Sequence, residues 1–273
     1  MLYQCPLCSQ PLALTGNCFK CESNHQFDIA KEGYVNLIPA NKKRSKNPGD
    51  NVDMMQARRR FLNTGCYSKL RDRVSQLCAE QLNNSQYRVL DIGCGEGYYT
   101  STIESTLSAV SAAPQVFGLD ISKVAIRYAA KKYPDCHFSV ASSQRLPFQS
   151  NSLDLVLRIY APCHQDELIR CIDDNGSIVT VTPAARHLYQ LRELLYDGVR
   201  LHNEEAETFS GFTLAHEEKL NYPMSLSGSD ALDLLQMTPF AWKATPEIKA
   251  NLAKADKFSC EADFMIRIYN KQP

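Results

Sequence analysis

From residue 86 onward, short apolar runs alternate with longer amphipathic stretches. The apolar runs predict buried strands at 87–92, 116–120, 137–140, 153–157, 177–181 and 257–269. The amphipathic stretches predict helices at 97–107, 123–132, 165–171 and 187–198. The turn Asp174-Asn175-Gly176 is expected to lead into the fifth strand. Strands joined by helices require right-handed crossovers and a parallel sheet, so the pattern predicts an α/β fold.

Composition divides the chain into three parts. Residues 1–38 are rich in Cys, and residues 39–84 are basic and polar, with a break at Pro48-Gly49 followed by a helical pattern. Residues 85–273 carry the α/β pattern. We therefore expect a small N-terminal module, a basic linker with a helix, and one large domain.

The 273 residues are 44% hydrophobic and 22% charged, which argues against a disordered or fibrous chain. The 11 Cys are an odd number, so complete disulfide pairing within one chain is impossible. The chain begins without the basic and apolar segments of a signal peptide, and no apolar stretch reaches the roughly 18 residues of a membrane span. We expect a cytoplasmic protein, in which clustered Cys more often bind a metal than form disulfides.

The formal net charge of zero conceals a strong local imbalance. Residues 41–73 hold ten basic side chains against three acidic ones, a net charge of +7, so the remainder carries −7. The basic residues are Lys42, Lys43, Arg44, Lys46, Arg58, Arg59, Arg60, Lys69, Arg71 and Arg73. Such a stretch can bind a phosphate backbone by counterion release, which favours nucleic acid over the alternative of a solvated helix face or linker.

The N-terminal module offers five candidate ligands for a metal ion: Cys5, Cys8, Cys18, Cys21 and His25. Tetrahedral zinc takes four ligands, and a CxxC pair brings two thiolates to one side of a turn. A four-Cys site and a Cys3His site both fit the spacing. Four protein ligands leave no open position, so the zinc is expected to stabilise a module that is too small to hold a core of its own. A redox CxxC is less favoured, because no βαβ unit surrounds the motif.

A glycine-rich loop follows the first strand of the large domain. The strand ends in Asp91, and Gly93, Gly95 and Gly97 then open a helix. Glycines permit positive φ and let a ligand approach the backbone closely. A second acid, Asp120, ends the next strand and can accept hydrogen bonds from both hydroxyls of a ribose. The pattern resembles the Rossmann-like class I methyltransferases that use S-adenosylmethionine; the alternatives are an NAD-binding loop and a tight turn without a ligand.

Later segments agree with this class in their order along the chain. Ser142 follows the third strand, where these enzymes place contacts to the adenine ring. The end of the fourth strand, at 158–162, corresponds to the place where the methyl group meets its acceptor. Tyr160 in this segment either stacks on a planar base or packs in the core.

Motifs outside the glycine loop carry a closer resemblance. They are Cys5-Pro-x-Cys8, the run from Cys21 through His25 to Leu37, Met55-x-Ala57-Arg58-Arg59, the segment 158–163, and Met237-Thr238-Pro239-Phe240-Ala241-Trp242. In this order, and over nearly the whole chain, they resemble the RlmA family of zinc-containing 23S rRNA (guanine-N1)-methyltransferases. The resemblance implies a homodimer and methylation of a guanine in hairpin 35 of 23S rRNA, at position 745.

The resemblance also assigns residues. It implies Cys5, Cys8, Cys21 and His25 as zinc ligands, which leaves Cys18 as an additional thiol. It implies contacts to S-adenosylmethionine from Tyr67, Gly95, Glu96 and His187. The family's commoner Pro-Gly-Gly turn is replaced here by Asp174-Asn175-Gly176, from which we infer no loss of activity.

The expected chemistry is attack of guanine N1 on the sulfonium methyl group. Guanine N1 carries a proton at neutral pH, so a base or an electrostatic aid is needed, and the candidates are Asp154, His164 and the Tyr160 hydroxyl. Pairing hides N1, so the target is unpaired or flipped out. Phe240 and Trp242 either stack on it or pack in the core. The alternatives are a non-catalytic zinc-dependent RNA-binding protein and a methyltransferase of a small molecule, the latter disfavoured by the basic stretch.

Overall fold

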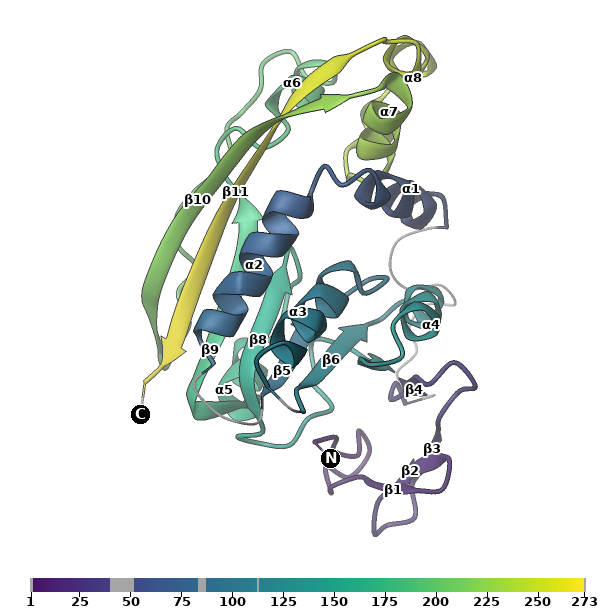
Figure 1. Cartoon of the computed structure of the whole chain (residues 1–273), viewed down its shortest axis with the longest axis vertical. Helices are drawn as coiled ribbons and strands as arrows, with labels where there is room; N and C mark the ends of the chain where they lie inside the picture. Colours follow the sequence, from purple (N-terminus) through teal and green to yellow (C-terminus); the bar gives the residue numbers. More distant parts are fainter. Residues whose placement is uncertain (1, 40–51, 83–86, 112, 273) are drawn as a thin grey trace.

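A computed structural model of the chain describes residues 2–39, 52–82, 87–111 and 113–272. It contains an eight-stranded sheet in the order β10-β11-β9-β8-β5-β6-β7-β4 (Figure 1). The strands are β4 (Val35–Asn36), β5 (Arg88–Ile92), β6 (Gln115–Asp120), β7 (His137–Val140), β8 (Leu153–Ile159), β9 (Ile172–Pro183), β10 (Phe212–Leu226) and β11 (Phe258–Lys271). Strands β4 to β9 pair in parallel, and β11 lies antiparallel between β9 and β10. The α/β prediction is confirmed.

The central position of β5 decides where a ligand can bind. The chain continues to β6 and β7 on one side of β5 and to β8 and β9 on the other. In open α/β sheets a ligand binds at such a reversal of strand order, outside the carboxyl ends of the strands. The fold therefore directs attention to the residues that follow β5, β6 and β8.

Consecutive residues of the central strands face opposite sides of the sheet. Val89 and Leu155 belong to the apolar cluster that includes the buried faces of α2 (Ser68–Glu80) and α3 (Tyr98–Ser108). Leu90 and Val156 belong to a second cluster, which includes α5 (Gln165–Cys171). All four side chains are fully buried, and burying one such side chain contributes about 1.5–3 kcal/mol. Two-sided burial explains why these strands appear in the sequence as apolar runs rather than as alternating patterns.

The N-terminal module packs on the sheet and is continuous with its core. It contains a three-stranded antiparallel sheet of β1 (Ala13–Thr15), β2 (Cys18–Lys20) and β3 (Gln26–Asp28). β4 then joins the edge of the large sheet beside β7. The Tyr3 ring lies 5.5 Å from the Phe117 ring and 5.1 Å from the Phe148 ring, measured between centroids. Side chains from Tyr3 to Leu37 thus contribute to an apolar cluster that continues into the large domain.

Further helices lie around the ends of β10 and β11 (Figure 1). They are α1 (Val52–Asn63), α6 (Tyr189–Glu193), α7 (Gly228–Gln236), the 3-10 helix η2 (Ala241–Lys243) and α8 (Pro246–Ala253). α1 packs against α7, and α2 packs against α3. The helical pattern expected in the linker is therefore present as α1 and α2. None of the helices in the described ranges is long and apolar enough to cross a membrane.

Two local predictions are wrong. Asp174-Asn175-Gly176 is not a separate turn before a strand, because β9 begins at Ile172 and runs through it. The pairing with β8 moves from Leu153↔Ile172 to Leu155↔Ser177, so the three residues form part of a bulge. The helix expected over 187–198 is reduced to α6. Leu188 has a φ of 52°, outside the helical region, so the helix begins only at Tyr189.

Candidate active site and zinc centre

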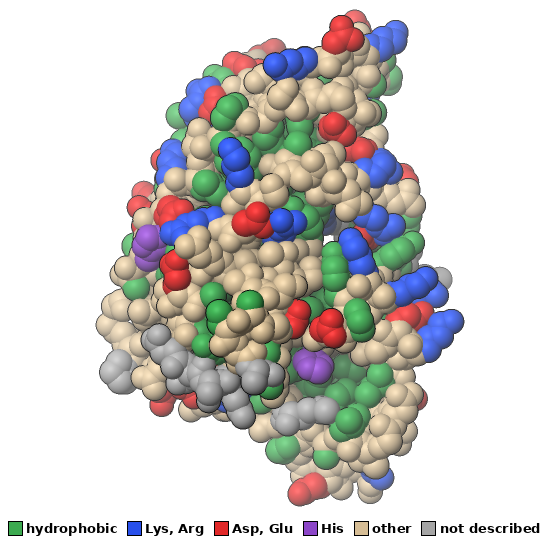
Figure 2. Space-filling model, in the orientation of Figure 1, with side chains coloured by type: hydrophobic (Ala, Val, Ile, Leu, Met, Phe, Trp, Pro, Cys, Tyr) green, Lys and Arg blue, Asp and Glu red, His purple; other side chains and the backbone are tan. Residues whose placement is uncertain are grey.

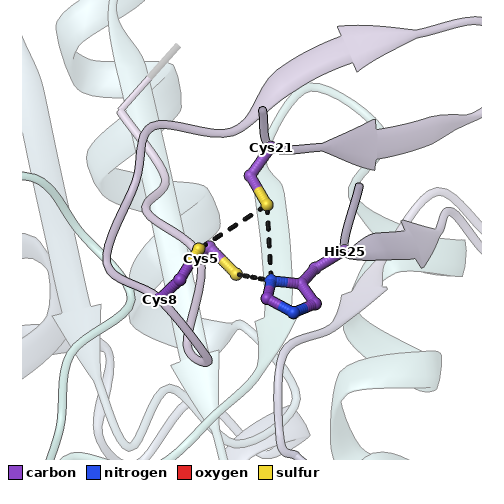
Figure 3. Close-up of side chains that lie close together, drawn as sticks. All are labelled: Cys5, Cys8, Cys21 and His25. Atoms are coloured by element: carbon purple, nitrogen blue, oxygen red, sulfur yellow. Dashed lines mark hydrogen bonds between the residues drawn. The ribbon is translucent and has the colours of Figure 1, made fainter. Parts of the chain in front are cut away.

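Four side chains of the N-terminal module converge on one point (Figure 3). The Sγ atoms of Cys5, Cys8 and Cys21 and a ring nitrogen of His25 all lie within 4.8 Å of one another. His25 Nδ1 is 3.5 Å from Cys5 Sγ and from Cys21 Sγ, and Cys8 Sγ is 3.6 Å from Cys21 Sγ. The Cys18 thiol donates instead to the carbonyl of Thr15 at 3.2 Å. The structure therefore brings together the Cys3His set and leaves Cys18 outside it.

The chemistry of this set fits a structural zinc ion. Three thiolates and one imidazole are a common tetrahedral ligand set, and with four protein ligands no position remains for water or substrate. Backbone hydrogen bonds shape the two ligand turns: Cys5 N–H donates to the Gln10 carbonyl, and Asn24 N–H donates to the Cys21 carbonyl. Cys5 and Cys21 are buried in the cluster that continues into the large sheet, so zinc binding also orders that contact.

The glycine loop passes over the carboxyl end of β6. The N–H groups of Gly93 and Cys94 both donate to the Leu119 carbonyl, at 2.8 and 3.1 Å. Gly93, Gly95 and Gly97 have φ values of 72°, 54° and 80°, a region that glycine adopts without strain. A Cβ added to Gly93 would lie 2.8 Å from Ala161 Cβ, whereas one added to Gly95 would meet no atom within 4 Å. The loop therefore has an open side at Gly95, where a ligand can approach the backbone.

Asp120 and Asp91 have different hydrogen-bond partners around this loop. Asp120 Oδ2 accepts from Gly95 N–H at 3.0 Å, and Oδ1 accepts from Ser122 N–H at 2.7 Å. A carboxylate oxygen can accept more than one hydrogen bond, so Asp120 fits its predicted place beside the ribose. Asp91 is buried and accepts from the Thr100 hydroxyl at 2.6 Å, which ties the loop to α3. Burial raises the pKa of Asp91 to about 7; the Thr100 hydrogen bond opposes the rise and the Asp120 carboxylate adds to it.

Helix α1 reaches the glycine loop through its side chains. Arg59 makes a two-pronged ion pair with Glu96, with nitrogen–oxygen distances of 2.6 and 2.5 Å, and its guanidinium lies 3.9 Å from the centroid of the Tyr128 ring. The buried Met55 Sδ lies 3.5 Å from Ser122 Oγ. Glu96, predicted to contact the cofactor, is thus also the residue that joins α1 to the loop.

The ion pairs of α1 and α2 change the interpretation of the basic stretch. Besides Arg59, Arg60 pairs with Asp233 at 2.6 Å, and Arg73 pairs with Glu218 at 2.6 Å. The described part of this stretch, residues 52–73, holds six basic side chains, and acids of the large domain neutralise three of them. Lys42, Lys43, Arg44 and Lys46 lie outside the described residues. Figure 2 shows Lys and Arg side chains gathered on the right of this face, over α1 and α4 (Lys123–Lys132).

A polar pair lies at the carboxyl end of β8, where methyl transfer is expected. The Tyr160 hydroxyl is 3.4 Å from His187 Nε2, and Asp263 N–H donates to His187 Nδ1 at 3.3 Å. Because Nδ1 accepts, the neutral ring carries its hydrogen on Nε2 and can donate it to the Tyr160 oxygen. Burial lowers the pKa of His187 to about 3, so the ring stays neutral. Tyr160 remains 49% exposed, although desolvation at the hydroxyl end raises its pKa.

The neighbours of this pair are Tyr67 and the buried acid Asp263. Tyr67 is buried between the rings of Phe61 and Phe264, with centroid distances of 5.0 and 5.2 Å. Burial raises the pKa of Tyr67 above its ordinary value, and the nearby Tyr160 adds to the effect. Asp263 is 1% exposed; its Oδ2 accepts from Arg186 N–H, and its Oδ1 has no hydrogen-bond partner in the described part of the chain. Asp263 was not among the predicted residues, and an acid inside an apolar strand was the only sequence signal for it.

Besides Tyr160, two candidate bases were predicted, His164 and Asp154, and Ser142 was predicted as a cofactor contact; the structure places the three in different positions. His164 follows β8 and begins α5, with an exposed ring whose Nδ1 is 3.6 Å from Asp166 Oδ2. Ser142 follows β7 and accepts from Gln144 N–H, so it lies at the same edge of the sheet. Asp154 does not lie near that edge, and its prediction is wrong: it is the second residue of β8, at the opposite end of the strand. It pairs with Arg88 at 2.5 Å, a structural role at the start of β5.

Comparison with known proteins places this geometry in a family. The model of the RlmA N-terminal region matches residues 3–46, and a methyltransferase domain model matches residues 89–179. A Bacillus subtilis protein, YxjB, whose name provisionally assigns it as a 23S rRNA (guanine-N1)-methyltransferase, is 31% identical over 265 residues, 94% of this chain and 92% of that protein. The chain belongs to the RlmA family. A second relative, the 23S rRNA (guanine(748)-N1)-methyltransferase of Streptomyces fradiae, is 30% identical and spans 89% of this chain and 87% of its own.

Membership of the RlmA family defines the enzyme class and its cofactors. The chain is a methyltransferase that uses S-adenosylmethionine and carries a zinc ribbon, and this confirms the predicted Rossmann-like class I architecture. The open side of the loop at Gly95 and the carboxylate of Asp120 fit S-adenosylmethionine. The predicted contacts of Tyr67, Asp91, Gly93, Gly97, Ser142 and His187 to that cofactor stay predictions.

Proposed function

We propose that this enzyme methylates N1 of a guanine in hairpin 35 of 23S rRNA, at position 745. The proposal rests on the edge of the sheet that follows β5 and β8, which carries an open glycine loop and a half-exposed Tyr160. The same chain holds a zinc ribbon of the RlmA type. Its relatives are named for guanine-N1 methylation of 23S rRNA, and the name of the Streptomyces fradiae enzyme gives position 748. The two positions are neighbours, so the test below must distinguish them.

The residues at the end of β8 have distinct tasks in the proposed reaction. S-adenosylmethionine, when bound, supplies a methyl group already activated on sulfur, so the protein mainly aligns the acceptor. His187 donates to the Tyr160 oxygen and leaves the Tyr160 hydrogen free to donate to an acceptor. Guanine O6 becomes more negative as N1 loses its proton, and a hydroxyl that donates to O6 stabilises that change.

The proton of guanine N1 needs a separate acceptor. His187 is unsuited, because its Nδ1 lone pair is occupied by Asp263 N–H and its pKa is lowered to about 3. His164 has an exposed ring close to the end of β8, and we assign it as the base. His164→Ala should therefore reduce kcat by about 100-fold, within the range that general bases contribute, with the affinity for S-adenosylmethionine unchanged.

Primer extension on 23S rRNA tests the whole proposal. N1 methylation blocks base pairing, so reverse transcriptase stops next to the modified guanine. A strain that lacks this gene should lose the stop at 745 and regain it when the gene is restored. A stop at 748 instead would correct the position, and unmethylated rRNA after incubation with pure enzyme and S-adenosylmethionine would refute the substrate.

The assembly and location follow from the same proposal. The RlmA resemblance supports a homodimer, which sedimentation equilibrium of the zinc-loaded chain can measure. A substrate in 23S rRNA places the enzyme with the ribosomes in the cytoplasm. A monomer that methylates RNA at full rate would refute the homodimer and leave the reaction standing.

A further inference from the structure

The only tryptophan of the chain lies on the surface with its ring exposed. Trp242 is in η2 and is 77% exposed. The ammonium of the next residue, Lys243, lies 5.5 Å from the centroid of the Trp242 ring and 4.1 Å from that of Tyr196, a residue that follows α6. We call these three side chains the Trp242 surface. Two aromatic rings with a cation between them are the components that proteins use to stack single-stranded nucleic acid.

The charge of Lys243 distinguishes this surface from the basic stretch. Arg59, Arg60 and Arg73 each hold a carboxylate at 2.6 Å or less. No carboxylate of the described residues lies within ion-pair distance of Lys243, whose neighbours are the two rings. The Lys243 charge is therefore available to a phosphate, whereas the three arginines already have partners.

Two segments of the chain link the Trp242 surface to elements that carry active-site residues. In the first, the Met237 carbonyl accepts from Arg58 of α1, the helix that also contacts the glycine loop through Arg59. In the second, Tyr196 follows α6, and α6 follows the loop that carries His187. Phe240, also predicted to stack on RNA, packs partly buried against the main apolar cluster. Of the two alternatives for Phe240, stacking and core packing, the structure favours core packing, and Trp242 is the exposed ring.

We infer that the Trp242 surface stacks an unpaired nucleobase that flanks the target guanine, while Lys243 binds the adjacent phosphate. The inference rests on the proposed function, since a guanine methylated at N1 is unpaired or flipped out, and in an unpaired loop the bases beside it are also open to stacking. Every nucleobase offers a π-face, so this contact adds affinity without reading sequence. An exposed indole beside an unpaired cation is complementary to a base joined to a phosphate.

The single tryptophan makes the contact directly measurable. A transcript of 23S rRNA hairpin 35 is titrated into the zinc-loaded full chain while Trp242 emission and the anisotropy of labelled RNA are followed. The emission should be quenched along the same binding curve as the anisotropy. Trp242→Ala should weaken RNA binding by about 5- to 100-fold, and Trp242→Phe should retain most of the affinity. Val110→Ala is the matched control, since Val110 is 67% exposed at the end of α3, and its binding should be unchanged.

The outcomes separate this inference from the proposed function. Lys243→Ala should lower the slope of log affinity against log salt by about 0.7, the value for one single-strand phosphate contact. If RNA binds and is methylated without any change in Trp242 emission, the inference is wrong and the proposed function stands. The same holds if Trp242→Ala binds and methylates RNA as well as the unchanged chain. An emission change that follows protein concentration without RNA indicates a contact between copies and also overturns the inference. An intact chain that neither binds nor methylates RNA refutes the proposed function as well.

Discussion

Replacing Asp120 by Ala tests how the glycine loop holds the cofactor. In the structure its two oxygens accept from Gly95 N–H at 3.0 Å and from Ser122 N–H at 2.7 Å. The first bond fixes the loop at its open glycine, and the second begins α4. The same carboxylate is the predicted acceptor for the ribose hydroxyls. Asp120→Ala therefore removes a ligand contact and a support of the loop in one step.

The magnitude follows from the number of hydrogen bonds to a charged group. Each such bond contributes about 1.5–3 kcal/mol. Loss of one ribose contact alone predicts an affinity for S-adenosylmethionine that falls about 10- to 100-fold, because about 1.4 kcal/mol corresponds to a factor of ten. Asp120→Asn should bind S-adenosylmethionine nearly as weakly as Asp120→Ala does. One of its two terminal atoms becomes a donor that faces Gly95 or Ser122 N–H.

Isothermal titration with S-adenosylmethionine measures this loss, and Ser122→Ala is the control. Ser122 Oγ accepts from Ala125 N–H as the N-cap of α4, so its loss should lower the free energy of unfolding by about 1 kcal/mol and leave cofactor affinity unchanged. Unchanged affinity in Asp120→Ala would refute the ribose assignment. Equal losses of affinity in Asp120→Ala and Ser122→Ala would mean that α4, rather than the carboxylate, determines binding.

Three other predictions concern metal, charge and pH. Cys21→Ser should lose bound zinc in a metal assay and have a lower melting temperature. Cys18→Ser should keep its zinc and its melting temperature, because the Cys18 thiol bonds to a carbonyl. Zinc loss in Cys18→Ser would contradict the Cys3His set. Arg60→Ala should leave the salt dependence of RNA binding unchanged, because Asp233 already neutralises Arg60; a smaller slope would show a phosphate contact there. The pKa of Asp91 is raised to about 7 by burial, above its unfolded value, so its contribution to stability is lost as pH rises from about 4 to about 7. In urea unfolding, the free energy of unfolding should decline less over that pH range in Asp91→Asn than in the unchanged protein. An identical decline in both would argue that Asp91 is ionised throughout.

Local patterns in the sequence determined most of the large domain. The strands from β5 to β9 are buried on both faces, so their apolar runs were visible without tertiary information. β10 was not predicted, because it is an edge strand whose central residues are largely exposed and include charged side chains. The positive φ at Gly93, Gly95 and Gly97 and the CxxC spacing are short-range requirements, which explains why the cofactor loop and the zinc site could be recognised.

Contacts between distant segments were decided only by the tertiary structure. Asp154 was expected beside the methyl group, but strand direction places it at the other end of β8 with Arg88. The arginines of α1 and α2 appeared free in the sequence, although Glu96, Asp233 and Glu218 neutralise three of them across 37 to 173 residues of chain. The hydrogen bonds that orient His187 toward Tyr160 also join distant segments, across 27 and 76 residues of chain. Periodicity and spacing report on backbone conformation over a few residues, whereas the pairing of charges and the ionisation of a buried group depend on which segments the fold brings together.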